Sequence, residues 1–333
     1  MSATVLTADV AHSNWIINKR EDLIWFIGSA LVGYLALAAA LAGMPVLTSI
    51  VLWTLIVDGP HLFGTVTRTY FDKTGRKQLG WRLWTLFPFL ALGPALCFLG
   101  LGTLFVVIFL TWTQYHIAKQ HFGFVMLYKK KNGERNDVQL DRKFIVTSCM
   151  LPWALILYVS YFKLPYPGIV TVIGVLSYGA FLLFYLKRQG QKKSEGLDLN
   201  TPKLMLFSIL IPLHWLAFAY AASRPSGVFL AGVAVNVGHS LQYHRLVWFH
   251  NRNRYFKNPE AKGLSKTLGR SVLYYGATCF GLYLLFFQIP TIMAGSNKVL
   301  LAMLGGINMT HFFLDSKIWR AREDKELAVA LNL

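Results

Sequence analysis

Long runs of apolar residues alternate along this chain with short polar segments. The runs Leu23 to Gly43 and Leu204 to Ala222 contain no charged side chain. Because a helix rises 1.5 Å per residue, each run is long enough to cross a hydrocarbon core of about 30 Å. Ten such segments are expected, at residues 22–43, 45–67, 83–100, 102–128, 143–163, 167–187, 203–222, 226–250, 269–289 and 297–318. The pattern predicts an all-α fold, a polytopic integral membrane bundle of about ten transmembrane helices.

The composition agrees with this pattern. Of the 333 residues 55% are hydrophobic and only 14% are charged, which excludes an ordinary soluble protein. The polar connections are short, so we expect one transmembrane domain at residues 22–318. It is flanked by cytoplasmic tails at residues 1–21 and 319–333.

The positive charge is distributed unevenly between the two ends of the predicted helices. With the N-terminus in the cytoplasm, all but four of the 33 lysines and arginines fall in cytoplasmic segments. Lys163, Arg224 and Lys298 fall on the other side, and Lys119 lies inside a predicted helix. This positive-inside asymmetry places both termini in the cytoplasm. It also accounts for the net charge of +18 without nucleic-acid binding, for which no module is visible.

Histidines inside the apolar segments are the candidate chemistry of this chain. Six of the nine histidines lie in four of the segments, and they are His61, His116, His121, His239, His244 and His311. Ionisable residues at membrane depth are functional candidates. All four segments are expected to run toward the cytoplasm, which places these histidines on the order of 10 Å inside the helix ends. Neutral imidazoles at one depth on four helices predict a metal site in the core of the bundle.

Two aspartates extend this set of candidate ligands. Asp58 precedes His61 by three residues and Asp315 follows His311 by four, so each pair shares one helix face. We expect the two carboxylates to complete the metal shell or to hold the imidazole tautomers, as catalytic residues of the site.

The two remaining histidine pairs are spaced differently. His116 and His121, like His239 and His244, are five residues apart, which separates their directions by about 140° on a regular α-helix. A π-bulge would bring both members into line, and such bulges favour functional sites. Without one, His121 and His239 are preferred as ligands over His116, and His244 is intermediate.

The other histidines are expected to serve structural roles. His214 is predicted to pack or to form a hydrogen bond near mid-membrane, and His250 is predicted to lie at the membrane interface. His12 falls in the polar N-terminal tail.

The donor set indicates the metal. Imidazoles and carboxylates without a thiolate cluster suit iron, zinc or manganese better than copper(I). Four to six imidazoles exceed the three protein ligands usual for catalytic zinc. Non-haem iron, as one or two ions, is therefore the expected cofactor. A site at this depth suits O2 and a hydrophobic substrate from the membrane lipid, with an electron donor left open as a further partner.

Four short motifs resemble the membrane-bound Brp/Blh-type β-carotene dioxygenases of bacteria and archaea. They are Pro60-His61, His121-Phe122-Gly123, the segment from His239 to His244, and Thr310-His311-Phe312. The resemblance implies iron ligation by His61, His121, His239 and either His244 or His311, cleavage of a carotenoid with O2, and a bacterial cytoplasmic membrane. Gly64 to Thr67 replace a histidine-bearing pair of that family, and the late motif is one residue longer, so a shared scaffold and metal site are implied more than a shared substrate.

Two other functions use the same residues. A metal-ion or proton transporter would carry polar residues on toward the outer face, whereas segments such as Val46 to Val57 and Gly102 to Leu110 are almost purely apolar. A haem or quinone electron-transfer subunit would use paired histidines on two helices. The oxygenase is the preferred interpretation.

Overall fold

The computed structural model describes residues 14–224 and 227–333. His12 lies outside the described residues. Within them the chain forms helices and turns and contains no strand, which confirms the all-α expectation. The α-helices are α1 Lys19–Glu21, α2 Ala30–Leu41, α3 Val46–Trp53, α4 Gly59–Thr69, α5 Lys73–Leu79, α6 Leu86–Phe98, α7 Gly102–Lys131, α8 Val138–Ile156, α9 Pro167–Ser194, α10 Thr201–Ala222, α11 Gly227–Asn251, α12 Leu264–Arg270, α13 Val272–Tyr283, α14 Ile289–Ala294, α15 Lys298–Ile318 and α16 Lys325–Ala330.

Short π-helical or 3-10 turns continue several of these helices. The π-helical turns are Asp22–Ile27, Thr54–Asp58, Leu157–Tyr161, Arg252–Phe256 and Leu284–Gln288, and the 3-10 turn is Gly80–Thr85. Helices joined in this way form longer rods, and eight rods among the described residues are long and apolar enough to cross a membrane. They are Lys19–Leu41, Val46–Thr69, Lys73–Phe98, Val138–Tyr161, Pro167–Ser194, Thr201–Ala222, Val272–Ala294 and Lys298–Ile318.

The two remaining predicted spans correspond to α7 and α11. Both helices are long, with 30 and 25 residues, but both carry polar side chains that lower their hydropathy. Most of α11 is buried, including Asn236, Ser240 and Gln242. A helix surrounded by other helices does not need an apolar surface toward lipid. The expected total of about ten spans depends on these two helices.

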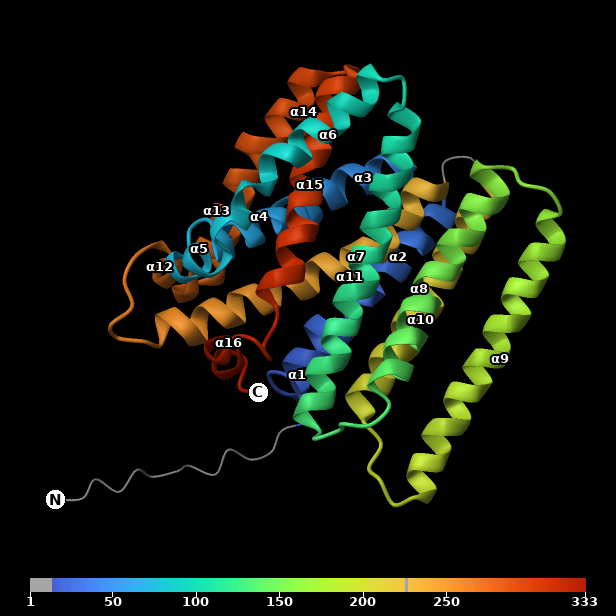
Figure 1. The fold of residues 1–333 in the computed structure, drawn as a ribbon, viewed down its shortest axis with the longest axis horizontal. Coiled ribbons are helices and arrows are strands. Elements are labelled where there is room, and N and C mark those ends of the chain that lie inside the picture. Colours follow the sequence, from blue (N-terminus) through green and yellow to red (C-terminus); the bar gives the residue numbers. More distant parts are fainter. Residues whose placement is uncertain (1–13, 225–226) are drawn as a thin grey trace.

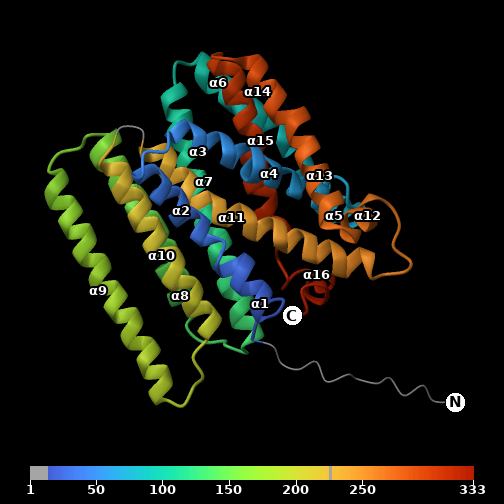
Figure 2. The same cartoon turned by 180° about the vertical axis from the view of Figure 1, so that it is seen from behind.

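The histidine-bearing helices pack against one another at the centre of the molecule. Helix α4 contacts α11 and α15, and α7 contacts the same two helices. Helices α8, α9 and α10 lie on one side of this group, with α9 outermost (Figure 1). Helices α5, α6, α12, α13 and α14 lie on the other side, and the view from behind shows the same division (Figure 2). The topology thus brings together four segments that are widely separated in the sequence.

Small residues allow α6 and α15 to approach closely. A Cβ atom on Gly93 would lie 2.4 Å from the Ala302 carbonyl oxygen, and one on Gly306 would lie 2.4 Å from the Phe89 carbonyl oxygen. Such contacts are typical of helix packing in membranes, where close van der Waals contact drives association. They fix the position of α15, which carries His311.

The two ends of the described chain meet at the C-terminal end of α7. Asn132 Nδ2 donates to the Asn14 carbonyl oxygen at 3.1 Å, and Lys131 Nζ donates to the Asn332 carbonyl oxygen at 2.6 Å. The segment predicted as a C-terminal tail includes α16, which buries Leu327 against the bundle. Both ends therefore lie at the same end of the bundle.

Candidate metal centre

Four histidine rings gather where α4, α7, α11 and α15 meet. The His61 ring centroid lies 5.3 Å from that of His239 and 4.8 Å from that of His311. The His116 ring lies 5.0 Å and 4.9 Å from the same two rings. All four side chains are buried. We call these residues the four-histidine cluster.

The partners of His61 define which of its nitrogens carries the proton. His61 Nδ1 contacts the Asp58 main-chain oxygen and lies 3.2 Å from Asp58 Oδ1. Ser240 Oγ donates to the same carboxylate oxygen at 2.9 Å. Because both Asp58 oxygens are acceptors, His61 Nδ1 is the protonated nitrogen. His61 Nε2 therefore presents a lone pair.

His311 is oriented in the same way through a hydroxyl group. Thr65 Oγ1 donates to Asp315 Oδ1 at 2.7 Å and lies 2.6 Å from His311 Nδ1. Tyr243 also donates to Asp315 Oδ1, at 2.8 Å. Since the Thr65 hydrogen is directed at Asp315, the Thr65 oxygen accepts a hydrogen from His311 Nδ1. His311 Nε2 then presents a lone pair as well.

The two lone pairs face each other. His61 Nε2 and His311 Nε2 are 3.2 Å apart, and neither carries a proton to share with the other. Two nitrogen ligands of one tetrahedral metal ion, each about 2.0–2.1 Å from it, would be roughly 3.3 Å apart. His116 Nε2 and His239 Nδ1 are buried and have no hydrogen-bond partner among the described residues. The arrangement has the spacing, the tautomers and the unsatisfied nitrogens of a metal site.

Potential ligand atoms form two overlapping groups. Nitrogens of His61, His239 and His311 lie within 4.8 Å of one another. Ligand atoms of His116, His311 and Asp315 satisfy the same limit. The groups share His311, so the residues fit either one ion or two neighbouring ions.

His244 stands outside the cluster. Its ring centroid lies 6.5 Å from that of His61, and both of its nitrogens have protein partners. His244 Nδ1 lies 3.1 Å from the Tyr275 hydroxyl group, and Nε2 lies 3.3 Å from the Val57 carbonyl oxygen. Because the carbonyl oxygen can only accept, Nε2 donates to it and Nδ1 accepts from Tyr275. His244 thus has no free lone pair for a metal.

His121 pairs with a residue that the sequence placed among the structural histidines. His121 Nε2 lies 3.5 Å from His214 Nε2, and Gln114 Nε2 lies 3.0 Å from His214 Nδ1. Both α7 and α11 are regular α-helices through their histidine pairs, without the π-bulge that would align residues five apart. His116 therefore faces α15 while His121 faces α10. The preference for His121 over His116 is therefore wrong, because His116 is the histidine of α7 that lies in the cluster.

The site also includes residues that the sequence analysis did not single out. Thr65, Ser240 and Tyr243 hold the imidazoles or the carboxylates behind them. Thr65 follows His61 by four residues, and Tyr243 follows His239 by four. That spacing places Thr65 on the same helix face as His61 and Tyr243 on the same face as His239. These residues could therefore have been predicted from the sequence as neighbours of the site. His250 is buried within the protein beside Asn251, and its place at the membrane interface stays a prediction.

Apolar side chains cover the cluster on the side of α6. The Phe312 ring stacks on His116 with a centroid distance of 4.6 Å. Phe105, Ala302 and Met309 form a buried cluster of their own on α7 and α15. This wall would keep bulk water away from ligands held by the histidines.

Comparison with known proteins gives no further guide to this site. No family model, no curated protein and no solved structure matches the chain, so the four histidine motifs and the geometry around them carry the assignment of function.

Proposed function

We propose that this chain is a membrane-embedded, non-haem iron oxygenase that acts on a hydrophobic lipid or isoprenoid, carotenoid-like in character, with O2. The observation that carries the proposal is the pair of opposed lone pairs on His61 Nε2 and His311 Nε2, 3.2 Å apart. Such a contact between two acceptors is favourable only with a cation between them.

The ligands we assign are His61, His239 and His311, with His116 as a fourth. Iron, when bound, supplies the redox chemistry that activates O2. The protein holds the imidazoles in one tautomer, because Asp58 lies behind His61 and the Thr65–Asp315 pair lies behind His311. Carboxylates and hydroxyl groups of this kind typically orient the histidine ligands of a metal site and raise their basicity.

The geometry supports a small ion over a haem group. Axial histidines on opposite sides of a metal would place their nitrogens about 4 Å apart, with the porphyrin between them. The 3.2 Å separation of the His61 and His311 nitrogens is shorter, and the rings are in direct contact. The apolar cluster around Phe105 and Met309 argues against an ion pathway toward that side. These two features favour the oxygenase over the electron-transfer subunit and the transporter.

The topology that belongs to this proposal has both termini in the cytoplasm and about ten spans, in a bacterial cytoplasmic membrane. It is supported by the positive-inside asymmetry and by the two ends of the described chain, which meet at the end of α7. Reporter domains fused after Leu333 and inserted at Gly196 should both report a cytoplasmic location. A periplasmic signal from both fusions would reverse the orientation, and a periplasmic signal from one alone would contradict the number of spans expected between Gly196 and Leu333.

The experiment that tests the proposed function measures metal content and O2 consumption together. The full-length chain is purified in detergent, and iron is counted per chain for the native sequence, His61→Ala and His311→Ala. We expect one or two irons per chain, lost in both variants, with no haem absorption band. Addition of a hydroxylated carotenoid or of farnesol should cause O2 uptake by the iron-loaded native protein only.

His250→Ala is the matched control, because His250 is equally buried but lies outside the cluster. It should retain iron. Protein that is metal-free after expression in iron-replete cells, with the same result in all variants, would leave the histidines as a hydrogen-bonded core or a proton path. A haem spectrum would favour the electron-transfer subunit instead.

A further inference from the structure

A pocket of about 390 Å³ opens on the side of the bundle next to the four-histidine cluster. Residues from α1 and the turn that follows it, from the turn Thr54–Asp58 and α4, from α11 and from α13 surround it. All of these elements except α11 belong to candidate membrane spans. The volume lies within the range of small-molecule sites in proteins, which is roughly 300–1,000 Å³.

The pocket reaches the neighbourhood of the candidate metal. His244 and Pro60 form part of its wall, and Pro60 is followed directly by His61. The His244 ring lies 6.5 Å from the His61 ring. A molecule in the pocket is therefore separated from the cluster by one layer of side chains.

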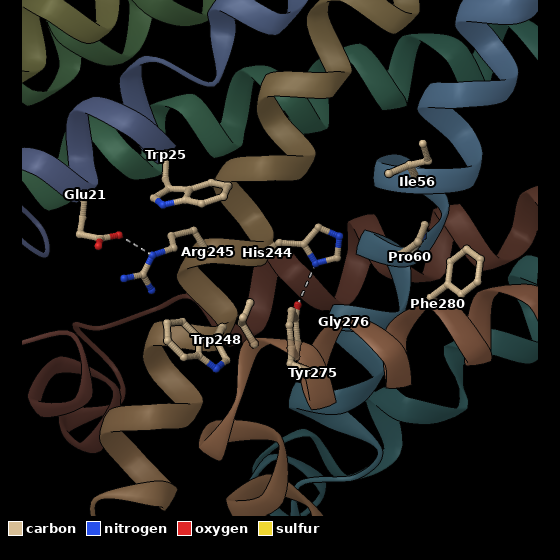
Figure 3. Close-up of a pocket in the computed structure, with 11 residues that line it drawn as sticks. Glu21, Trp25, Ile56, Pro60, His244, Arg245, Trp248, Tyr275, Gly276 and Phe280 are labelled. Atoms are coloured by element: carbon tan, nitrogen blue, oxygen red, sulfur yellow. Dashed lines mark hydrogen bonds and ion pairs between the residues drawn. The ribbon is translucent and has the colours of Figure 1, made fainter.

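The two ends of the pocket differ in polarity. Figure 3 shows the Glu21–Arg245 pair at one end, Ile56 and Phe280 at the other, and His244 between them. Arg245 Nε donates to Glu21 Oε2 at 2.9 Å, and Arg245 Nη1 has no acceptor among the described residues. Because Nη1 is enclosed by protein, a ligand can reach only the 12% of the Arg245 side chain that is exposed, and the polar end combines a neutralised charge with this partly exposed cation.

The apolar end faces outward. Ile56 and Val272 are 63% and 58% exposed, and both lie on rods that can span a membrane. Large apolar side chains that are this exposed within a span meet lipid, so the pocket is open to ligands that arrive through the bilayer.

We propose that this pocket binds the substrate of the enzyme, and that the substrate is an uncharged amphiphile with an apolar chain and one hydroxyl or carbonyl oxygen. The oxygen accepts a hydrogen bond from Arg245, and the chain lies along His244 toward Ile56 and Phe280. A carboxylate or phosphate is disfavoured, because it would lie against Glu21. A pure hydrocarbon leaves the guanidinium without an acceptor. The proposal rests on the proposed function, since it takes the bound molecule to be the substrate of the neighbouring centre.

Three isoprenoid probes of one chain length test the proposal. Radiolabelled farnesol binding is measured on the full-length protein in phosphatidylcholine nanodiscs, in competition with farnesoic acid and with the hydrocarbon farnesane. We expect farnesol to bind at least about tenfold more tightly than either competitor, as one hydrogen bond to a charged donor would give. In Glu21→Gln the affinity for farnesoic acid should rise and should approach or exceed the affinity for farnesol. Equal affinity for alcohol and hydrocarbon would overturn the proposal.

Glycines on α13 give a pair of matched variants. A Cβ atom on either Gly276 or Gly281 would have open space around it, but only Gly276 lines the pocket. Gly276→Leu should reduce farnesol binding at least about tenfold, and Gly281→Leu should leave it unchanged. Unaltered binding in Gly276→Leu would contradict the assignment of the site.

Iron content, counted on the same samples, separates this proposal from the proposed function. Both glycine variants should keep the iron of the native protein. If the protein holds iron but does not bind farnesol, the assignment of the pocket is wrong and the proposed function is unaffected. The protein could instead hold no iron and still bind farnesol in a way that Gly276→Leu abolishes. That result would support the proposed class of ligand, but it would contradict the oxygenase and the role of the bound molecule as its substrate.

Discussion

His61 Nε2 and His311 Nε2 lie 3.2 Å apart, although the two residues are 250 positions apart in the sequence. The Nδ1 atom of each ring is held by an oxygen, from Asp58 in one case and from Thr65 in the other. The two rings are therefore fixed with their free nitrogens opposed. The contact between Thr65 and His311 Nδ1 can be removed by one substitution.

Replacement of Thr65 by valine should weaken iron binding by roughly 10–100-fold, which is typical for loss of a group that orients a metal ligand. Valine has a similar shape but offers no acceptor to His311 Nδ1 and no donor to Asp315. The affinity is measured by competition with a coloured chelator.

Thr67→Val is the control for this variant. Thr67 is buried on the same helix, but its hydroxyl group donates to the Gly64 carbonyl oxygen rather than to the site. Its iron affinity should equal that of the native protein. Equal losses in both variants would point to damage to α4 as a whole.

A second prediction concerns acid stability at the end of the bundle where α7, α9 and α10 meet. Burial alone would raise the pKa of Glu134, but hydrogen bonds from Lys192, Lys203 and Lys129 outweigh it and lower that pKa to about 2. A carboxyl group whose pKa is lower in the folded state stabilises the fold above its ordinary pKa of 4.5 and loses this contribution as the pH falls toward 2.

Glu134→Gln should therefore lower the Tm by several degrees at pH 7, and the difference from the native protein should shrink between about pH 4.5 and 2. Thermal unfolding in detergent across this range provides the measurement. Glu323→Gln, at an exposed ion pair with Arg320, should have little effect at any pH. A constant Tm difference down to pH 2 would show that Glu134 acts through packing instead of charge.

The all-helical fold, and the presence of His61, His116, His239 and His311 among the candidate residues, could be predicted from the sequence, because both depend on local patterns. Apolar runs of span length predict helices wherever they occur, and a histidine inside such a run stands out against its neighbours. The spacing of Asp58 and His61, or of His311 and Asp315, fixes a shared face within one helix.

Which histidine of a pair faces the centre depends on the rotation of each helix, and that is set by its neighbours. His116 meets α15 and His121 meets α10 because of how α7 packs, which its own spacing does not reveal. The role of Thr65 likewise appears only when α15 is placed beside α4. Polar residues on α11 are tolerated because most of that helix is buried, and α7 carries buried polar residues such as Gln114 and His121 and three lysines in its last turn. These residues lower the hydropathy of both helices, which is why hydropathy identifies them least well.

A third prediction tests the close contact between α6 and α15. Alanine at Gly306 would place its Cβ atom 2.4 Å from the Phe89 carbonyl oxygen, so the helices must separate. We expect destabilisation of about 1–3 kcal/mol, as is usual for overpacking, together with weaker iron retention because His311 lies five residues further along α15. Thermal unfolding and iron counts on one preparation measure both effects.

Gly232→Ala serves as the comparison, because a Cβ atom on Gly232 of α11 would have open space around it. That change should be neutral or slightly stabilising, as alanine is the better helix former. If Gly306→Ala proves as harmless as Gly232→Ala, then the position of α15 does not depend on this contact.

The last prediction separates the two histidines of α7. His116 has an unpartnered Nε2 atom in contact with the His239 and His311 rings, whereas His121 Nε2 faces His214. We expect His116→Ala to lower iron affinity by at least about tenfold, as the loss of one metal ligand would. His121→Ala should retain iron close to the native level, with a lower Tm from the cavity that it leaves. His214→Ala should behave like His121→Ala, since it removes the other member of the same pair. Iron lost from His121→Ala but kept by His116→Ala would instead assign the role of ligand to His121, as the resemblance to the carotene dioxygenases implies.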